Sequence, residues 1–388
     1  MNTDSVSYMT GKNVMIIAIL AVAVIASAAV LVTMSLSENT ESPSLDTPDV
    51  PDPEIPDPEP VYPEGLSFDL ETGSLSYMES TVWQVTDELV AYVDKKVQEK
   101  EGESIILHKG LYTVKVNGET FNVIVPGKET IEASWPYKFE DNWYDISVTY
   151  DIDIEELAKI TLANRDWNDG INNSQFMNLP KQVYVNDTVR NIVSQLKAAY
   201  IEMGGSMDDE QSYAEFIASF AQLGIEYPPW EIIPDTGAQS SDYHYWGIDD
   251  YWANTLETLY FGKGDCEDSS AVACALFIAA GFKTAIVGGS GHVMSSVSLD
   301  SFKERDTPRY GPVMISFDVA SSTSAYFVSD PTVTYYGVDT TKGQTPVGYL
   351  TKEQLRHINT DSDIVARMPQ GLSGYYSVDR DGSDSYLG

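Results

Sequence analysis

The sequence predicts an α+β fold, in which helices come first, a central buried helix follows, and an antiparallel sheet comes last. Three observations support this prediction. Val189–Met203 and Tyr213–Leu223 carry apolar residues at helical spacing. Ala271–Ala280 is apolar on nearly every face, as in a buried helix, and Gly281 is a suitable residue to end it. Strand-like runs then follow, and this order of elements is typical of the α+β class.

The charge of the chain narrows the classes of partner. Among 388 residues, Lys and Arg number 23 and Asp and Glu number 59, which gives a net charge of −36. A chain this acidic, with no separate basic patch, is not expected to bind nucleic acid. It shows no zinc-ligand spacing, phosphate-binding glycine loop or dinucleotide fingerprint, so we expect neither a metal nor a cofactor.

The first segment of the chain bears on its localisation. Val14–Met34 is apolar or small throughout, and about 20 such residues span a bilayer. Lys12 precedes this run and acidic residues follow it, which favours a cytoplasmic tail at 1–13, a transmembrane anchor at 14–36 and an extracytoplasmic body. The sequence therefore predicts a single-pass protein of the cell membrane. The alternative is a secreted protein, cleaved at the small residues Ala26–Ala28.

Residues 66–186 predict one or more small β-rich modules. Leu111–Val125 alternates apolar and polar residues around Asn117-Gly118, the preferred pair for a two-residue hairpin turn. Asp87–Val93 has a helical pattern, and Ile154–Leu162 is amphipathic. The region therefore combines a hairpin with short helical segments.

The predicted α+β domain occupies residues 187–345. An acidic, proline-rich linker at 37–65 precedes the module, and a partly disordered extension at 346–388 follows the domain. The strands expected after the buried helix are Thr284–Val287, His292–Leu299, Val313–Val319, Tyr326–Val328 and Val333–Val338.

The two cysteines, Cys266 and Cys274, are predicted to be free thiols. On one helix, eight residues separate their Cα atoms by about 12 Å, whereas a disulfide allows no more than about 7 Å. Asp265 is the expected N-cap of that helix, with Asp268 completing a capping box. Cys266 then lies in the first turn, where the helix dipole favours a thiolate. The acidic neighbours oppose this effect, so a base is needed.

His292 is the candidate base, because it begins a predicted strand after a glycine-rich turn. Acyl transfer also needs a group that orients the imidazole and stabilises its charged form, and this group is usually a carboxylate. Asp318 and Asp330 lie on or after the following strands, and the pattern of the residues does not choose between them.

Four stretches carry a resemblance to a known family, and they are Phe220–Tyr227, Asn254–Leu259, the Gly-Asp-Cys-Glu-Asp block of Gly264–Asp268, and Gly291–His292. Together they resemble the transglutaminase-like superfamily, and more narrowly its microbial and archaeal surface members, over about Gln211–Val338. The resemblance implies a papain-like domain in which a buried helix bearing the nucleophile packs on an antiparallel sheet, after a small β-rich module.

The resemblance also implies roles for individual residues. Cys266 is the nucleophile, His292 the base and Asp330 the orienting acid, since family members often follow that aspartate with Pro-Thr, as here; Asp318 is the reserve. The oxyanion donor is open, with the backbone N–H of Cys266 and, by position alone, the side chains of two further residues as candidates. These two residues are Gln222 and Trp252.

The function implied is that of a membrane-anchored, extracytoplasmic cysteine acyltransferase or amidase with a protein or peptide substrate. Its thiol attacks an amide carbonyl, forms a thioester and passes the acyl group to an amine or to water. Hydrolysis and transamidation share the first half of this reaction, so both remain open. The alternative is a catalytically inactive binding or scaffold protein of the cell surface with the same fold.

Overall fold

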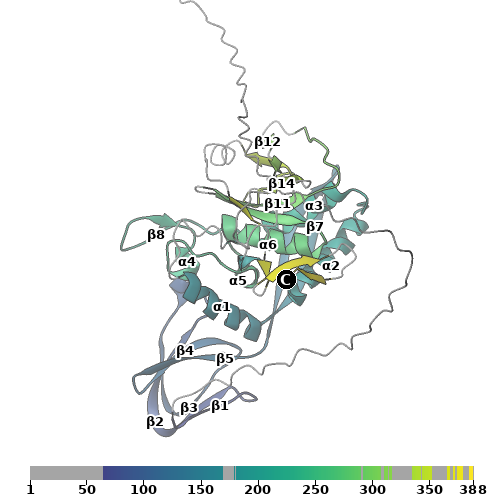
Figure 1. The fold of residues 1–388 in the computed structure, drawn as a ribbon. Coiled ribbons are helices and arrows are strands. Elements are labelled where there is room, and N and C mark those ends of the chain that lie inside the picture. Colours follow the sequence, from purple (N-terminus) through teal and green to yellow (C-terminus); the bar gives the residue numbers. More distant parts are fainter. Residues whose placement is uncertain are drawn as a thin grey trace, which may run out of the picture. The chain divides into compact units, whose positions relative to one another are not determined.

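The computed structural model describes residues 64–168, 179, 181–289, 292–306, 310–312, 314–316, 334–341, 343–351, 365–367, 370–371, 374–378 and 384–387. Within these residues the fold is mixed α+β, which confirms the predicted class (Figure 1). Most strands pair antiparallel, and several helices lie between the two larger sheets in the chain order.

The first sheet holds strands β1 to β5 in the order β1-β2-β4-β5, and β3 pairs with another part of β2. All of these pairs are antiparallel. The strands are β1 Leu66–Asp69, β2 Ser74–Asp87, β3 Gln98–Ile106, β4 Gly110–Val116 and β5 Glu119–Val125. Asn117 and Gly118 both have positive φ, as the predicted two-residue turn requires. The sheet has an apolar core of its own around Leu75 and Trp83.

A long hairpin and two helices follow. The hairpin is β6 Lys128–Phe139 with β7 Asn142–Asp153, and after it come α1 Ile154–Asn168 and α2 Asp187–Glu202. Side chains of β6 and β7 alternate between buried and exposed, so one face of the hairpin joins the core. Trp135 on β6 donates its indole N–H to the hydroxyl of Ser219, the last residue of helix α3 (Glu210–Ser219), at 3.0 Å, which fixes the hairpin against that helix.

The central helices lead to the candidate site. They are α3 Glu210–Ser219, a π-helical turn η3 Phe220–Gly224, α5 Thr255–Phe261 and α6 Cys266–Ala279. Helix α5 begins with a capping box made by Asn254 and Glu257. Helix α6 is buried on nearly every face from Glu267 to Ile278, and Gly281 follows its end with a φ of +84°, so the predicted buried helix and its glycine stop are confirmed.

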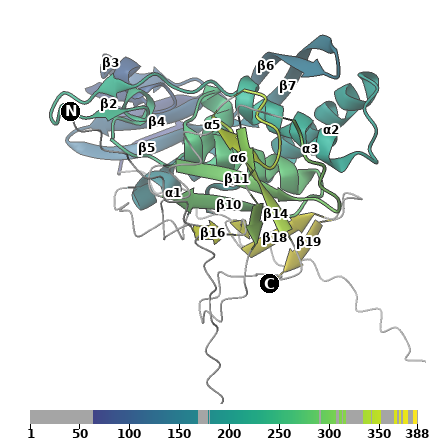
Figure 2. The ribbon, with the colours of Figure 1, turned by 90° about the horizontal axis from the view of Figure 1, so that it is seen from above.

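The second sheet runs in the order β12-β15-β14-β11-β10-β16, with β13 on β14. Its strands are β10 Thr284–Gly289, β11 His292–Ser298, β12 Tyr310–Pro312, β13 Met314–Ser316, β14 Thr334–Val338, β15 Tyr349–Thr351 and β16 Val365–Arg367. Pairing is antiparallel throughout except between β14 and β15. Helix α6 contacts β10 and β11 at the centre of this sheet (Figure 2).

One hydrophobic core joins α6 to elements on both sides of residue 186, where the predicted β-rich module ends and the predicted α+β domain begins. The first buried residue of this core along the chain is Leu89 and the last is Val347. Trp135 on β6 and Leu157 on α1 also belong to it. The hairpin β6-β7 and helix α1 therefore share the core of the second sheet, and Leu111 of β4 reaches into the same core from the first sheet. The apolar packing that holds α6 in place comes from most of the described chain.

Smaller elements complete the description. They are a 3₁₀ turn η1 Tyr92–Asp94, the strands β8 Glu231–Ile232 and β9 Gln239–Ser240, the short helix α4 Tyr243–Trp246, and the strands β17 Gln370–Gly371, β18 Gly374–Val378 and β19 Asp384–Leu387. The predicted helix at Asp87–Val93 is wrong, since Asp87 still pairs with Tyr112 of β4 at the end of β2, the next residues form a bend, and only the turn η1 begins inside this range. At Asp87, pairing within the sheet outweighs local helix propensity.

The predictions about the membrane need correction. Among the described residues, no helix is both long and apolar enough to span a bilayer. This finding contradicts the predicted transmembrane helix, the membrane as a partner and the single-pass localisation in the cell membrane. The segment Val14–Met34 and nearly all of the linker lie outside the described residues, as do the predicted strand Tyr326–Val328 and much of the C-terminal extension.

Candidate active site

Cys266 is the first residue of α6 and is half-buried. Asp265 occupies the N-cap position as predicted, but its side chain makes no capping hydrogen bond. Its Oδ2 instead accepts the Ser241 hydroxyl at 2.9 Å. Asp268 makes no capping box either, because its Oδ1 accepts the backbone N–H of Ala253 at 2.7 Å. The acidic residues at the helix start therefore face a neighbouring loop.

The thiol of Cys266 has a protonated ground state. Burial raises its pKa above the usual range, and the charge of Asp265 raises it further. Its Sγ donates a hydrogen bond to Oε2 of Glu267 at 3.0 Å, and the backbone N–H of Val293 lies close enough to oppose the rise. The start of the helix alone does not give a thiolate, so a reaction at this sulfur needs a base.

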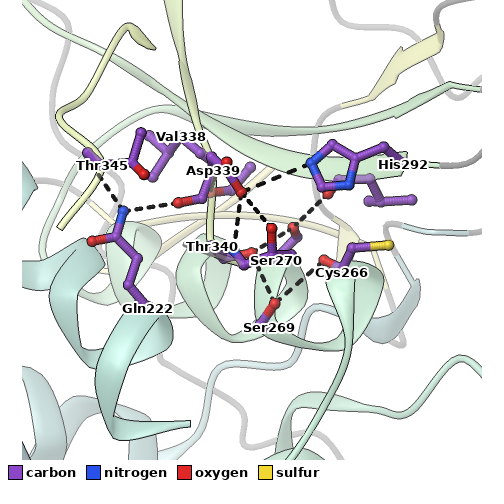
Figure 3. Close-up of polar contacts among 12 residues, drawn as sticks. Gln222, Cys266, Ser269, Ser270, His292, Val338, Asp339, Thr340 and Thr345 are labelled. Carbon is purple, nitrogen blue, oxygen red and sulfur yellow. Dashed lines mark hydrogen bonds and ion pairs between the residues drawn. The ribbon is translucent and has the colours of Figure 1, made fainter. Parts of the chain in front are cut away.

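His292 and Asp339 lie together beside this thiol. His292 begins β11, Asp339 follows β14, and Nε2 of the imidazole is 3.8 Å from Oδ1 of the carboxylate. Both side chains are buried, with 7% and 0% of their surface exposed. In Figure 3 the Asp339 carboxylate lies to one side of the imidazole, and the Cys266 side chain lies below the ring at the start of α6. A thiol, an imidazole and a carboxylate are the three groups that acyl transfer requires.

The register of the sheet places these groups. Strands β11 and β14 pair antiparallel, with Ser295 opposite Val338. The start of β11 and the end of β14 therefore lie side by side at the same end of these strands. The N-terminus of α6 lies at that same end, because the backbone N–H of Val293 acts on the Cys266 thiol and the Ser270 hydroxyl donates to the backbone oxygen of Val293 at 3.4 Å. Residues 266, 292 and 339 are thus brought together by one helix and two strands.

The segment after β14 is held in place by hydrogen bonds. Thr341 donates both its backbone N–H and its hydroxyl to Oδ1 of Asp339, at 3.0 and 2.9 Å. The hydroxyl of Thr340 is 2.8 Å from that of Ser269 and 3.2 Å from that of Ser270, both on α6. These contacts orient the carboxylate toward the imidazole and tie it to the helix that carries Cys266 (Figure 3).

Gln222 and Trp252, the candidates for an oxyanion donor, have their donors engaged elsewhere. Gln222 on η3 donates through Nε2 to the backbone oxygens of Asp339 and Thr345, at 2.8 and 2.9 Å. Trp252 donates its indole N–H to Oδ1 of Asp250 at 2.9 Å. Gln222 is therefore a positioning residue for the Asp339 segment, and Trp252 belongs to the acidic loop beside α6.

The structure brings together Cys266 and His292 as expected, and the acid beside them is Asp339. The predicted acid Asp330 and the reserve Asp318 both lie outside the described residues. Asp339 was missed, although a signal existed. It directly follows the predicted strand Val333–Val338, and a carboxylate at the end of a strand that neighbours the His292 strand could have been considered.

Several carboxylates around the helix start could hold a cation. They are Asp242, Asp250, Asp265, Glu267 and Asp268, and overlapping groups of three, one of which includes the Cys266 sulfur, place one ligand atom per residue within 4.8 Å of one another. These residues lie on the segment around α4, which precedes α5, and on the N-cap and first turn of α6.

Comparisons with protein-family models, with curated proteins and with solved structures gave no match.

Proposed function

We propose that this chain is a cysteine acyltransferase or amidase of transglutaminase-like type, which forms a thioester at Cys266. The observation that carries the proposal is a half-buried thiol at a helix start, close to the start of β11, where His292 lies with Asp339 3.8 Å from its imidazole. A nucleophile, a base and an orienting acid in this order are the components of acyl transfer. In this proposal α6 and the strands β10, β11 and β14 form the catalytic core, and β1 to β5 form an accessory module.

The reaction follows from the roles of the side chains. His292 takes the thiol proton, while Asp339, 3.8 Å from the Nε2 of the ring, stabilises the imidazolium that forms. The sulfur attacks the carbonyl carbon of a peptide or glutamine amide, and the C–N bond breaks. The proton on His292 leaves with the amine or ammonia. Water or a second amine then attacks the thioester and releases the thiol.

The hydrogen bond between Cys266 and Glu267 defines the resting state in this mechanism. The thiol proton points to a carboxylate oxygen at 3.0 Å, so it must turn toward His292 before the proton moves. A substrate amide that occupies the space beside the thiol would displace this contact. The proposal therefore places proton transfer after substrate binding.

The test uses the full chain with a glutamine-containing peptide and an excess of a small primary amine, analysed by mass spectrometry. Incorporation of the amine indicates transamidation, conversion of glutamine to glutamate indicates side-chain hydrolysis, and shortened peptides indicate proteolysis. We expect one of these products with the native protein and with Cys274→Ala, and none with Cys266→Ala. The same product yield from all three proteins and from buffer alone would refute the proposal.

A catalytically inactive binding or scaffold protein is the second candidate, and one observation favours it. Burial and the neighbouring Asp265 raise the pKa of Cys266, which keeps the nucleophile protonated. If the site has lost its activity, wild type and Cys266→Ser behave identically in both the hydrolysis and the amine-incorporation assays. A difference between the two proteins in either assay excludes this candidate.

A further inference from the structure

The segment 226–241 forms a short hairpin that starts beside the nucleophile. Its strands β8 and β9 pair antiparallel. The backbone N–H of Glu226 donates to the oxygen of Gly262 at 2.9 Å, and the oxygen of Glu226 accepts the N–H of Gly264 at 3.2 Å. Gly264 lies two residues before Cys266. The start of the hairpin is therefore fixed to the segment that leads into α6.

The end of the hairpin is fixed to the same segment. The Ser241 hydroxyl donates to Oδ2 of Asp265, the residue before Cys266, at 2.9 Å. Tyr227, near the start of the hairpin, also lies close to the thiol. Burial raises the pKa of its phenol, and the charges of Asp265, Cys266 and Glu267 raise it further. A peptide whose amide lies at Cys266 therefore has this hairpin as a neighbour.

Helix α4 supports the hairpin on another side. Nδ1 of His244 on α4 is 2.7 Å from Oε1 of Glu231 on β8, and the two elements lie next to each other (Figure 1). The Ser240 hydroxyl on β9 donates to the backbone oxygen of Asp249 at 2.6 Å. Pro228-Pro229 restricts the backbone before β8. A surface held in place before it binds loses little conformational entropy on binding.

The face of β8 away from α4 exposes large apolar side chains. Trp230 and Ile232 have 61% and 65% of their surface exposed. They flank Glu231 along the chain, and successive side chains of a strand point to opposite faces. Because Glu231 points toward α4, Trp230 and Ile232 point away from it. Two large apolar side chains fixed on one exposed face are typical of a surface that binds an apolar group.

The charges around this surface limit what could cover it. Asp235 lies in the turn of the hairpin, Asp249 lies next to its second strand, and both are exposed. The whole chain carries a net charge of −36. A second copy of the chain or an anionic lipid surface would therefore be repelled. A peptide that carries a large apolar side chain and a basic residue complements both the apolar side chains and the carboxylates.

We propose that Trp230 and Ile232 form a binding subsite for a large apolar side chain of the peptide substrate, a few residues from the amide that Cys266 attacks. Trp230 lies three residues after Tyr227, at most about 10 Å along an extended chain, a length that about three residues of a bound peptide also span. A basic residue next to the apolar one would face the exposed carboxylates. The assignment rests on the proposed function, since the occupant is the substrate of that reaction.

The test is isothermal titration of the full chain carrying Cys266→Ala with a short peptide that contains Gln, Phe and Arg. This background lacks the nucleophile, so binding is measured without turnover. Trp230→Ser and Trp230→Phe are added to it in turn. Trp143→Ser is the matched control, since Trp143 on the β6-β7 hairpin is 65% exposed. A second peptide has Ala in place of Phe.

We expect the Phe peptide to bind saturably to the Cys266→Ala protein, to the Trp143→Ser control and, with a small loss, to Trp230→Phe. Trp230→Ser should weaken its binding by about 10- to 30-fold, as expected when an anchoring tryptophan is lost. The Ala peptide should bind Trp230→Ser and the parent protein equally weakly. Absence of saturable binding of the Phe peptide to the parent protein would overturn the proposal. So would equal affinity for this peptide in Trp230→Ser and Trp143→Ser.

The titration reports on the subsite and product formation by the native chain reports on the proposed function, so the two can fail separately. Sedimentation velocity of the same proteins measures whether copies of the chain associate. We expect monomers of the Cys266→Ala protein and of Trp230→Ser alike. A dimer that Trp230→Ser dissociates would show that a second copy covers this surface, and it would overturn the proposal.

Discussion

Helix α6 carries both cysteines of the chain, and their surroundings differ at its two ends. Cys266 is the first residue of the helix and is half-buried. It lies next to Glu267, the backbone of Val293 and the start of β11, where His292 lies. Cys274 is fully buried two turns later, where its sulfur accepts the hydroxyl of Thr284 at 3.4 Å. The same residue type on the same helix therefore lies beside a carboxyl group and partly open to solvent in one case, and buried in the core beside a single hydroxyl in the other.

This difference shows where reactivity has to come from. Burial raises the pKa of both thiols, to about 12 in the case of Cys274, so neither is a thiolate at neutral pH by itself. What separates them is the group that could take the proton. Cys266 has the His292–Asp339 pair beside it, whereas Cys274 has a hydroxyl donor. The account therefore assigns reactivity to the neighbouring base rather than to the position on the helix.

The largest expected effect comes from removing each thiol in turn. Cys266→Ala should reduce product formation by at least about 10³-fold, since the nucleophile is lost and acyl transfer cannot begin. Cys274→Ala should retain activity within about twofold. The measurement is the initial rate of product formation from a glutamine peptide. A larger loss of rate in Cys274→Ala than in Cys266→Ala would reverse the comparison.

The next effect concerns the acid behind His292. Asp339→Asn should lower the rate by about 10²-fold or more, because an amide neither stabilises the imidazolium nor fixes its tautomer as a carboxylate does. Asp330→Asn is the matched variant, since the sequence assigned the role to that residue. Initial rates at saturating peptide compare the two. If Asp330→Asn is the more damaging change, the acid of the site is the one that the sequence predicted.

A smaller effect is expected on stability from Gln222→Leu. Gln222 donates to the buried backbone oxygens of Asp339 and Thr345, and its loss should lower the free energy of unfolding by about 2 kcal/mol. Gln195→Leu is the control, since Gln195 also contacts backbone, that of Thr149, but from an exposed position where water can replace it. Urea unfolding measures both. Equal losses would mean that Gln222 does not position the Asp339 segment.

The smallest effect concerns the packing of Cys274. Cys274→Ala removes one buried sulfur and should cost about 1 kcal/mol of stability, because a small cavity remains. The alkylation rate of Cys266 should not change, since the two thiols share no partner in the described structure. A thermal melt and peptide mapping report the two quantities. A changed rate at Cys266 would show that the two ends of α6 are coupled.

Elements defined by neighbouring residues could be predicted from the sequence. The hairpin between β4 and β5 follows from Asn117-Gly118, and α6 follows from its continuous apolar run and Gly281. Both free thiols follow from their spacing on the helix. These features depend on contacts within a few residues, which the local pattern specifies.

Elements defined by distant contacts could not be predicted in the same way. β2 extends through Asp87 because Asp87 pairs with Tyr112, although the local pattern there favours a helix. Asp339 reaches His292 through the register of β11 on β14, which no local spacing reveals. The Asp265 carboxylate turns to Ser241 rather than capping α6, so a local capping rule gave way to a contact with a loop 24 positions away.

Alkylation of the native chain by iodoacetamide, followed by peptide mapping, tests the central claim most directly. The account predicts that Cys266 is labelled at least about tenfold faster than Cys274, since only the former has a base and partial access to solvent. His292→Ala should lower the rate at Cys266 and leave that at Cys274 unchanged. Equal, slow labelling of both thiols, with no response to His292→Ala, would contradict the account.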